Sequence, residues 1–465
     1  MKYSHNNWTN IRGQAIPNWS SLRRHTTPEW LDDLKFGIYC HWGPQTVKLA
    51  NMDKGLSTKE AIELWKGEKF SAKEWVDLFQ AAGAQFGGPI AWHGSGMLNW
   101  KSEITDWNTF EKGPGVDIVK ELSDELRERG MKVMGSFHST NIWGPITKDD
   151  DIYNEKRSDQ MLQGWYERVT EAIDKYELDI VWVDEFFGGT VGPELRGRFV
   201  DGRLLDGADN SLSGIREQFQ QKLVCHFYNK GIEWGKDVAF IYKSFDIPPG
   251  IGMRDIENGS LKGLQYHPWM ADINMAHHHV EPLCWFYKKE NPMKDANALI
   301  DMLVDMTSKN GRMLLSVPPT ADGTFSEEAR NELLKMGKWL KNNGEAIYGT
   351  IPWVFFGEGP NEVIKEGHHA QGINRGEFIA RYNEKDIRFT QKDNYLYATC
   401  LGWPGKELRI RALGHKGKLY AGDIKSVSML GTDEEIKWEH NGEALIVQFP
   451  KTPPCEFAYC IKIGR

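Results

Sequence analysis

Short β-rich runs alternate with amphipathic stretches over the first three quarters of the chain. The short runs predict strands at residues 35–41, 85–92, 131–138, 178–186, 237–242 and 312–318. The stretches between them repeat apolar residues with a helical period, which predicts helices at 72–82, 116–128, 159–175, 211–230, 296–309 and 326–343. Strands that alternate with helices predict a parallel sheet with right-handed crossovers.

Two kinds of α/β fold fit this alternation. Six strands, with room for two more between about 245 and 295, fit a (β/α)8-like TIM barrel, and a doubly wound sheet also fits. Polar and aromatic residues lie at the carboxyl ends of nearly every predicted strand, among them His41, Trp92, His138 and Asp184. A barrel builds its active site from the carboxyl ends of several strands, whereas an open sheet concentrates function at one switch point. We therefore expect a barrel as the catalytic domain, over residues 1–353.

The pattern changes after about Trp353. Helical periodicity ends there, and short alternating segments separated by turns begin. They predict strands at 387–391, 396–401, 408–413, 424–430, 444–448 and 457–463. We expect these strands to form a C-terminal β-sandwich domain over residues 354–465.

The composition is that of a globular protein and argues against several classes. The chain has 465 residues and a formal net charge of −8 without a broad basic face, so we expect no nucleic-acid partner. No apolar run approaches the ~20 residues of a membrane helix, so we expect no membrane partner either. Six cysteines without CxxC spacing argue against a disulfide scaffold or a zinc ribbon. The 19 tryptophans suit the apolar faces of sugar rings, and equally a large core.

The first ten residues, MKYSHNNWTN, lack the apolar segment of a secretion signal. The sequence therefore leaves two compartments open. We expect a cytoplasmic protein, or a periplasmic or secreted one from which a signal was removed.

Carboxylates at two places are the clearest candidates for chemistry. The segment DIVWVDEFF ends a predicted strand with Asp184 and Glu185, of which only one can face the barrel mouth, and Trp182 shares the face of Asp184. Asp255 and Glu257 follow a Pro-Pro-Gly turn in GMRDIENGS. Glycoside hydrolysis needs two carboxyl groups that flank the scissile bond. The structural alternatives are a helix cap at Asp184 and a solvated acidic turn at the second place.

Histidines are a second group of candidates. His41, His93 and His138 fall at or near strand ends, where they suit sugar hydroxyls, a metal ion or the core. The run 277–279 consists of three histidines with Glu281 close by, which suggests a metal cluster. Three consecutive residues do not easily aim at one ion, however, and no HExxH or HxH spacing accompanies them. We therefore expect no metal and no cofactor.

Taken together, these segments resemble the α-L-fucosidases of glycoside hydrolase family 29. The matching segments keep their order along the chain: KFGIYCHWG, AGAQF, DIVWVDEFF, YNKGIEWGKD, YKSFDIPPGIGMRDIENG, NGRMLLSVPPTADGT and GKWLKNNGEAIYGTIPW. The segment FTQKDNYLYATCLGWPG resembles the C-terminal β domain of the family.

The resemblance implies a retaining exo-glycosidase that hydrolyses terminal α-L-fucosides by double displacement. Asp184 falls at the position of the family's nucleophile, and Glu257 falls where one branch of the family carries its acid/base, with Asp255 as the alternative acid. Glu257 must then start the reaction protonated while Asp184 is ionised. The expected substrate-binding residues are His41, Trp42, His93, His138, Trp182, Trp269 and His278.

Two departures from the family pattern bear on the substrate. The family's HHDG segment reads His93-Gly94-Ser95-Gly96 here, and its Glu-Trp-Tyr segment after the first strand is missing. Both segments normally bind the hydroxyls of unsubstituted fucose. We therefore hypothesise a sulfated or otherwise substituted α-L-fucoside, or an α-L-galactoside from algal polysaccharide, as the substrate.

Two further function classes stay open: a carbohydrate-binding protein that lost turnover, and a metal-dependent hydrolase that uses the run 277–279. Two carboxylates argue against a pure binder, which has no need of a buried charged pair. The expected partner is a fucosylated or related oligosaccharide, and the residues predict no oligomeric state.

Overall fold

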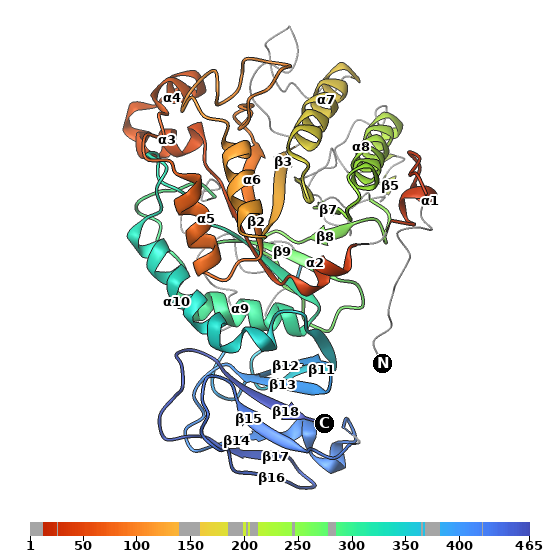
Figure 1. The fold of residues 1–465 in the computed structure, drawn as a ribbon, viewed down its shortest axis with the longest axis vertical. Coiled ribbons are helices and arrows are strands. Elements are labelled where there is room, and N and C mark those ends of the chain that lie inside the picture. Colours follow the sequence, from red (N-terminus) through yellow and green to blue (C-terminus); the bar gives the residue numbers. More distant parts are fainter. Residues whose placement is uncertain are drawn as a thin grey trace.

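The computed structural model describes residues 13–25, 27–138, 159–184, 199–200, 203–204, 213–243, 247–277, 285–363, 366–367, 382–420 and 422–465. In Figure 1 a barrel surrounded by helices forms one part of the molecule, and antiparallel sheets near the C-terminus form the other. Within these residues no helix is both long enough and apolar enough to cross a membrane.

Eight parallel strands close the barrel. They are β1 (Phe36–Cys40), β2 (Phe86–Trp92), β3 (Lys132–His138), β4 (Ile180–Asp184), β7 (Ala239–Tyr242), β8 (Met253–Asp255), β9 (Trp269–Asn274) and β10 (Gly311–Ser316). Each strand pairs with the next barrel strand along the chain, and β10 pairs with β1 to complete the circle. The predicted (β/α)8-like barrel is confirmed, and β8 and β9 are the two strands expected between 245 and 295.

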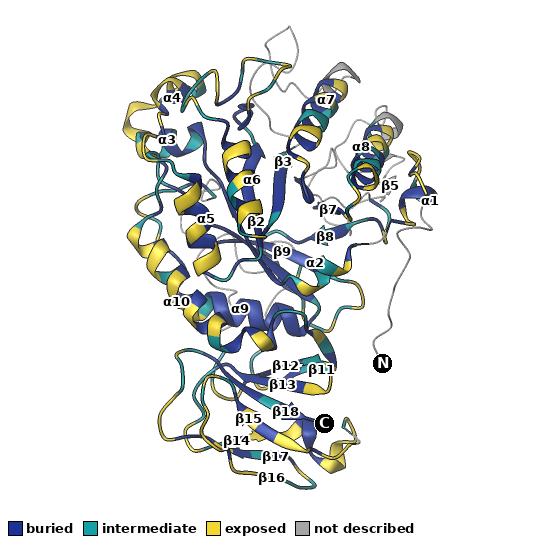
Figure 2. Ribbon diagram, in the orientation of Figure 1, coloured by how far each residue is buried: buried dark blue, intermediate teal, exposed yellow. Residues whose placement is uncertain are grey.

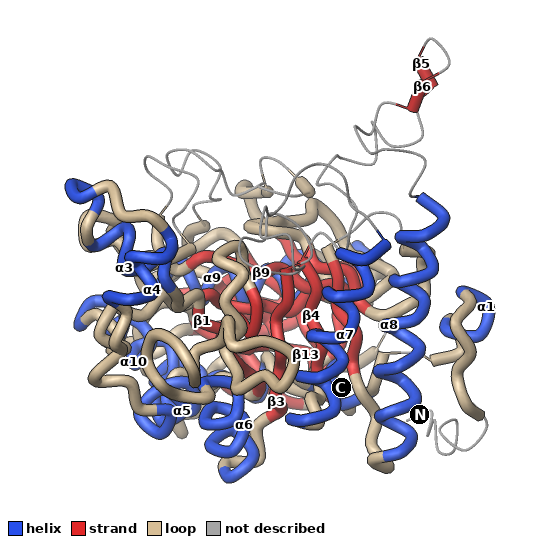
Figure 3. The backbone as a smooth tube through the Cα atoms, turned by 90° about the horizontal axis from the view of Figure 1, so that it is seen from above, coloured by secondary structure: helices blue, strands red, loops and turns tan. Residues whose placement is uncertain are grey.

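Helices surround the strands, as the view from above in Figure 3 shows. The long ones are α5 (Ala72–Ala81), α6 (Ile118–Glu128), α7 (Asp159–Tyr176), α8 (Ser213–Glu233), α9 (Ala296–Ser308) and α10 (Glu327–Asn343). Side-chain oxygens that accept backbone N–H groups fix the starts of four of them, at Ser71, Asp117, Asp295 and Ser326. The pattern did not predict the short helices α1 (Trp19–Leu22), α2 (Glu29–Asp33), α3 (Pro44–Ala50) and α4 (Thr58–Leu64), nor the pair β5 (Phe199–Val200) and β6 (Arg203–Leu204).

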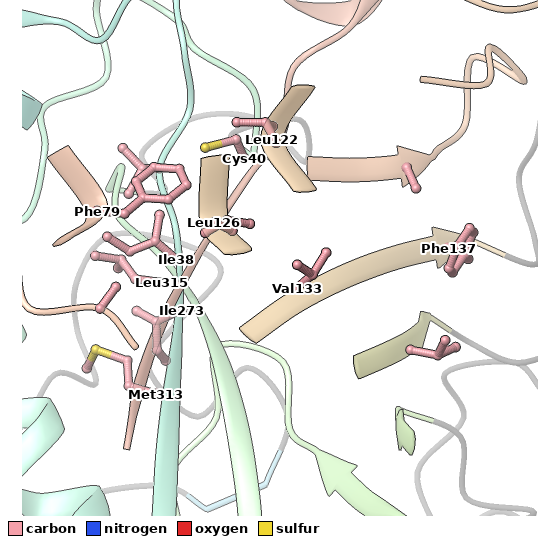
Figure 4. Close-up of a cluster of buried hydrophobic side chains, with 14 of the residues drawn as sticks. Ile38, Cys40, Phe79, Leu122, Leu126, Val133, Phe137, Ile273, Met313 and Leu315 are labelled. Atoms are coloured by element: carbon pink, nitrogen blue, oxygen red, sulfur yellow. The ribbon is translucent and has the colours of Figure 1, made fainter. Parts of the chain in front are cut away.

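The strand side chains divide between two cores, because successive residues of a strand point to opposite faces. The outward-facing side chains pack against the helices, and Figure 4 labels a part of this layer: Ile38, Cys40, Phe79, Leu122, Leu126, Val133, Phe137, Ile273, Met313 and Leu315. The inward-facing ones, such as Tyr39, Trp182 and Met270, fill the barrel interior. Figure 2 shows the result, with buried strands inside helices whose outer faces are exposed.

Two antiparallel sheets form the C-terminal part. The larger has the order β11 (Ile351–Glu358), β12 (Ile387–Lys392), β13 (Tyr395–Cys400), β18 (Tyr459–Gly464) and β15 (Ser426–Met429), and the smaller has the order β14 (Glu407–Ile410), β17 (Leu445–Gln448) and β16 (Trp438–His440). Apolar side chains from both sheets share one core. The predicted C-terminal antiparallel domain is confirmed. Its predicted boundary after Trp353 falls within β11 and stays a prediction.

A buried ionic cluster joins α9 to the larger sheet. One carboxylate oxygen of Asp305 lies 2.6 Å from Arg388 Nε of β12, and the other lies 2.7 Å from Lys309 Nζ. The ring of Phe356 lies against both cations, 5.0 Å from Lys309 Nζ and 5.6 Å from the Arg388 guanidinium carbon. Burial raises the pKa of Asp305, but the two cations outweigh burial and leave that pKa below its ordinary value. We call Asp305, Lys309 and Arg388 the interdomain cluster.

Candidate active site

Asp184 is the last residue of β4 and lies at the carboxyl end of the barrel. It stands beside His138, the last residue of β3, in the strand register, and its Oδ2 lies 3.1 Å from His138 Nε2. Lys243 follows β7, the neighbour of β4 on its other side, and its Nζ lies 3.4 Å from the same Oδ2. Barrel closure thus brings three strand ends together around one carboxylate.

Lys243 contacts further carboxyl groups. Its ammonium nitrogen lies 3.1 Å from Glu257 Oε2 and 3.0 Å from Asp272 Oδ2, in addition to its contact with Asp184. The indole ring of Trp182 lies against the ammonium, with its centroid 4.8 Å away. One buried ammonium therefore contacts carboxyl groups from three parts of the barrel.

The charge on Lys243 depends on these neighbours. Burial by itself lowers the pKa of an amine, because a low-dielectric interior disfavours the charged form. The carboxylates of Asp184, Asp272 and Glu257 outweigh burial, so the pKa of Lys243 lies well above its ordinary value. The amine is therefore an ammonium near neutral pH.

Asp255 and Asp272 form a pair of interacting carboxyl groups that are fully buried. Asp255 also accepts from Trp182 Nε1 at 2.8 Å and from the backbone N–H of Asp272 at 3.1 Å, and Tyr39 OH donates to Asp272 Oδ2 at 2.9 Å. Burial raises the pKa of both groups, and Asp255 raises that of Asp272 further, to well above its ordinary value. The pair therefore retains a proton that exposed carboxyl groups would lose.

Glu257 is more accessible than this pair. Its side chain is 15% exposed, whereas Asp255, the alternative acid considered from the sequence, has no exposed surface and already accepts two N–H groups. A proton donor must reach the leaving oxygen of the substrate. The geometry favours Glu257 over Asp255 for that task.

Three imidazoles lie beside the carboxyl groups. The ring centroids of His41 and His93 are 5.4 Å apart, and those of His93 and His138 are 3.9 Å apart. Burial, and then the neighbouring imidazoles, lower the pKa of His41 and of His93 well below the ordinary value, so both rings are neutral. His41 Nδ1 lies 2.8 Å from Ser316 Oγ, and Trp285 stacks on its ring. A neutral imidazole has one donor and one acceptor, which suits a sugar hydroxyl.

Trp42 is not part of this cluster, contrary to the position expected from the sequence. Its side chain is 3% exposed and packs against the rings of Trp65, Phe70 and Trp75, at centroid distances of 4.9–5.4 Å. Its indole N–H donates to the carbonyl of Thr320. The residue after His41 therefore stabilises the outer core.

Trp269, expected from the sequence to bind substrate, also lies away from the cluster. It begins β9, at the amino end of the barrel, and its indole N–H donates to the carbonyl of Lys309. Its side chain belongs to the outer core, because Met270 and Asp272 face inward and alternation turns Trp269 outward.

Other predicted residues fall outside the described part of the chain. His278 is one of them, together with Glu185, His279 and Glu281. Among the residues that the structure does describe, no group of three or more His, Cys, Asp or Glu side chains is arranged to hold a metal ion.

The sequence reasoning missed Lys243 and Trp285. Lys243 directly follows a predicted strand, so the rule that selected His138 and Asp184 would have selected it too. The pattern of carboxylates and histidines at strand ends does not include a lysine. Trp285 lies on a connection whose position only the folded barrel defines.

Carboxyl groups at the carboxyl end of a TIM-like barrel, beside neutral imidazoles and indole rings, define a glycoside hydrolase. Residues 3–345 match the sequence pattern of the α-L-fucosidase family, and residues 382–464 match that of the α-L-fucosidase C-terminal domain. The chain belongs to the α-L-fucosidase family.

Individual relatives agree with this assignment. The chain is 25% identical to human tissue α-L-fucosidase and 26% identical to the human plasma enzyme, in each case over 93% of this chain and 88% of the relative. The fold matches that of Thermotoga maritima α-fucosidase in complex with fucose, with a TM-score of 0.72 and 23% identity over 97% of this chain and all of the other. These matches support α-L-fucosidase activity and a carbohydrate substrate.

Proposed function

We propose that the protein hydrolyses terminal α-L-fucosides with retention of configuration, with Asp184 as the nucleophile and Glu257 as the acid/base. The observation that carries the proposal is the contact of both carboxyl groups with one nitrogen, Lys243 Nζ, at 3.4 and 3.1 Å. The sum of these two distances, about 6.5 Å, is the upper limit on the separation of the contacting oxygens, and retaining glycosidases have carboxyl groups ~5–5.5 Å apart.

In the first step an oxygen of Asp184 attacks the anomeric carbon while the bond to the leaving oxygen breaks. Glu257 gives its proton to that oxygen, so the aglycone leaves as an alcohol. The products of this step are a fucosyl ester on Asp184 and a carboxylate on Glu257.

In the second step Glu257 takes a proton from water, and the resulting hydroxide oxygen attacks the anomeric carbon. The ester bond breaks, Asp184 leaves as a carboxylate, and fucose is released with its original configuration. Both groups return to their starting states, so no cofactor enters the balance.

The sugar hydroxyls are assigned to the imidazoles of His41, His93 and His138. Their closeness to each other and to Asp184 supports this role. Trp182 is 1% exposed and lies beneath Lys243, where it holds Asp255 through its indole N–H. We therefore assign Trp182 to the floor of the site.

The mechanism is tested with Asp184→Gly, Glu257→Ala and an aryl α-L-fucoside. Asp184→Gly should lose turnover and, with azide, form β-L-fucosyl azide, because azide enters from the face that the carboxylate has vacated. Glu257→Ala should regain turnover with azide and form α-L-fucosyl azide. NMR of the wild-type reaction should show α-L-fucose as the first product. Full activity of Asp184→Gly, or β-L-fucose as the first product, would contradict the proposal.

We further propose that the preferred fucoside carries a substituent. The support is Gly94 at the place where the family pattern has a second histidine. The value of kcat/KM should then be higher for a sulfated α-L-fucoside, or for an α-L-galactoside, than for the plain α-L-fucoside. Equal or higher efficiency with the plain sugar would contradict this part alone.

A further inference from the structure

Lys243 lies between the two groups that carry the proposed chemistry. Its ammonium contacts Asp184 Oδ2 and Glu257 Oε2 at the same time, and its side chain is 4% exposed. The ring of Trp285 lies 5.5 Å from the nitrogen, on a different chain segment from Trp182. Aromatic rings and carboxyl groups therefore surround this cation and limit its contact with water.

We propose that Lys243 is a positioning residue that serves as a shared counter-ion, paired with Asp184 before the first proton transfer and with Glu257 after it. The inference rests on the proposed function and extends it. It assigns a task to a side chain that need not touch the sugar.

The reason lies in how charge moves during the reaction. Before the first step, Asp184 carries the negative charge and Glu257 is neutral. After that step Asp184 is a neutral ester and Glu257 is a carboxylate, so one negative charge has passed from one neighbour of Lys243 to the other. The second step returns it. A cation in contact with both groups stabilises both charge distributions with little rearrangement, which is the preorganised electrostatic help that lowers barriers in enzymes.

The other groups around Lys243 are consistent with this role. The titratable groups that face the ammonium are Asp184, Asp255, Glu257 and Asp272, with the imidazoles of His41 and His93 close enough to act on it and His138 and Tyr39 one contact further away. Burial raises the pKa values of Asp255 and Asp272, and His41 and His93 are neutral. The charge that changes place in the reaction is therefore the one on Asp184 and Glu257.

The test is the pH dependence of kcat/KM for an aryl α-L-fucoside, measured for the wild type and for Lys243→Met, Lys243→Gln and Lys243→Arg. Loss of the cation makes both Asp184 and Glu257 harder to ionise. In the Lys243→Met and Lys243→Gln variants, the acidic and the basic limb of the pH profile of kcat/KM should therefore both move to higher pH, by about one to two pH units. The value of kcat should fall by about 100-fold or more, with a smaller change in KM. Lys243→Arg keeps the charge, and its limbs should stay at their wild-type pH.

Lys309→Met is the matched control. Lys309 is also a buried lysine paired with an aspartate, but it lies in the interdomain cluster. This variant should lose thermal stability, and both limbs of its pH profile should stay at their wild-type pH. A purely structural role of Lys243 predicts the same outcome for Lys243→Met, and that outcome would overturn the inference.

Two further outcomes also decide whether Lys243 serves as a counter-ion. If Lys243→Met and Lys243→Gln do not fold, Lys243→Arg decides, because limbs that shift despite the retained charge contradict a counter-ion. The azide products of the Asp184 and Glu257 variants are measured with Lys243 intact. Their failure refutes the proposed mechanism, whereas their success with unshifted limbs in Lys243→Met refutes the counter-ion alone.

Discussion

The protein has two buried charged clusters. One buried lysine lies at the centre of the first cluster, and another buried lysine lies at the edge of the second. At the carboxyl end of the barrel, Lys243 contacts three carboxyl groups. In the interdomain cluster the ratio is reversed, because two cations, Lys309 and Arg388, share the single carboxylate of Asp305. Both clusters are buried, but they differ in how fully each charge is satisfied.

The interdomain cluster has fixed partners. Asp305 and Lys309 are four residues apart on α9, so the helix itself sets their contact. Arg388 uses its remaining N–H groups on the carbonyls of Ile387 and Asn361. Such an arrangement suits a contact between the barrel helix α9 and the larger C-terminal sheet, because each polar group has a defined geometry.

The cluster around Lys243 has more carboxyl groups than one cation can neutralise. It therefore retains protons and holds carboxyl groups whose ionisation can change. Such an arrangement costs stability and is useful where a proton and a charge must move. The comparison indicates that the ratio of acids to cations distinguishes the proposed catalytic cluster from the interdomain cluster.

The largest expected effects come from removing one carboxylate from each cluster. Asp184→Asn should lower kcat by at least about 1,000-fold, because the amide is a poor nucleophile, while thermal stability stays unchanged or rises as acid repulsion is relieved. Asp305→Asn should lower the free energy of unfolding by about 3–5 kcal/mol, because two buried cations lose their counter-charge. The value of kcat per folded molecule should not change. Thermal melting and turnover, measured on the same preparations, check both expectations.

The opposite pattern of effects would contradict the distinction between the two clusters. A strong loss of stability in Asp184→Asn, or a strong loss of kcat in folded Asp305→Asn, would show that the two clusters share their tasks. The double variant should show additive changes, because the two sites share no partner.

A smaller effect concerns Asp301, one turn before Asp305 on α9. Burial raises the pKa of Asp301 to about 8, with Arg388 opposing the rise and nearby aspartates adding to it. The folded protein thus holds a proton that the unfolded chain releases above about pH 4. The free energy of unfolding should therefore fall as pH rises from about 4 to 8 and then level off, by about 5–6 kcal/mol at most.

Asp301→Asn removes this dependence, since an amide does not titrate. The melting temperature of the variant minus that of the wild type should rise between pH 5 and pH 8. A constant difference over that range would mean that Asp301 is ionised in the folded protein. Glu327→Gln, on the surface of α10, is the control and should show no such trend.

The sequence predicted most of the barrel because its strands are short apolar runs between amphipathic helices. The run at 131–138, for example, became β3 (Lys132–His138). The helices α3 and α4 were missed because an apolar stripe of two turns is too short to show a period. The edge strand β11 was missed because buried and exposed residues do not alternate along it.

The site was only partly predictable. Asp184 and Glu257 followed from strand ends and from family resemblance, but the contact of Lys243 with both depends on how the closed barrel sets β7 against β4 and β8. Trp269 was misplaced because it begins β9 at the amino end of the barrel, and its position three residues before Asp272 turns its side chain to the opposite face. Distances between strand ends are a property of barrel closure, and no local pattern contains them.

The smallest expected effect concerns Trp42, which follows His41 in the chain but packs in the outer core. Trp42→Phe should lower the free energy of unfolding by about 1–2 kcal/mol, because the ring shrinks and the hydrogen bond to Thr320 is lost. The KM for an aryl α-L-fucoside should stay within about twofold, since the rings of Trp65, Phe70 and Trp75 pack against the indole ring of Trp42. His41→Ala, one residue earlier, should instead raise KM strongly and also lower the melting temperature, because it removes a buried ring that contacts Ser316 and Trp285. If Trp42→Phe raised KM strongly and left the melting temperature unchanged, Trp42 would belong to the sugar site after all.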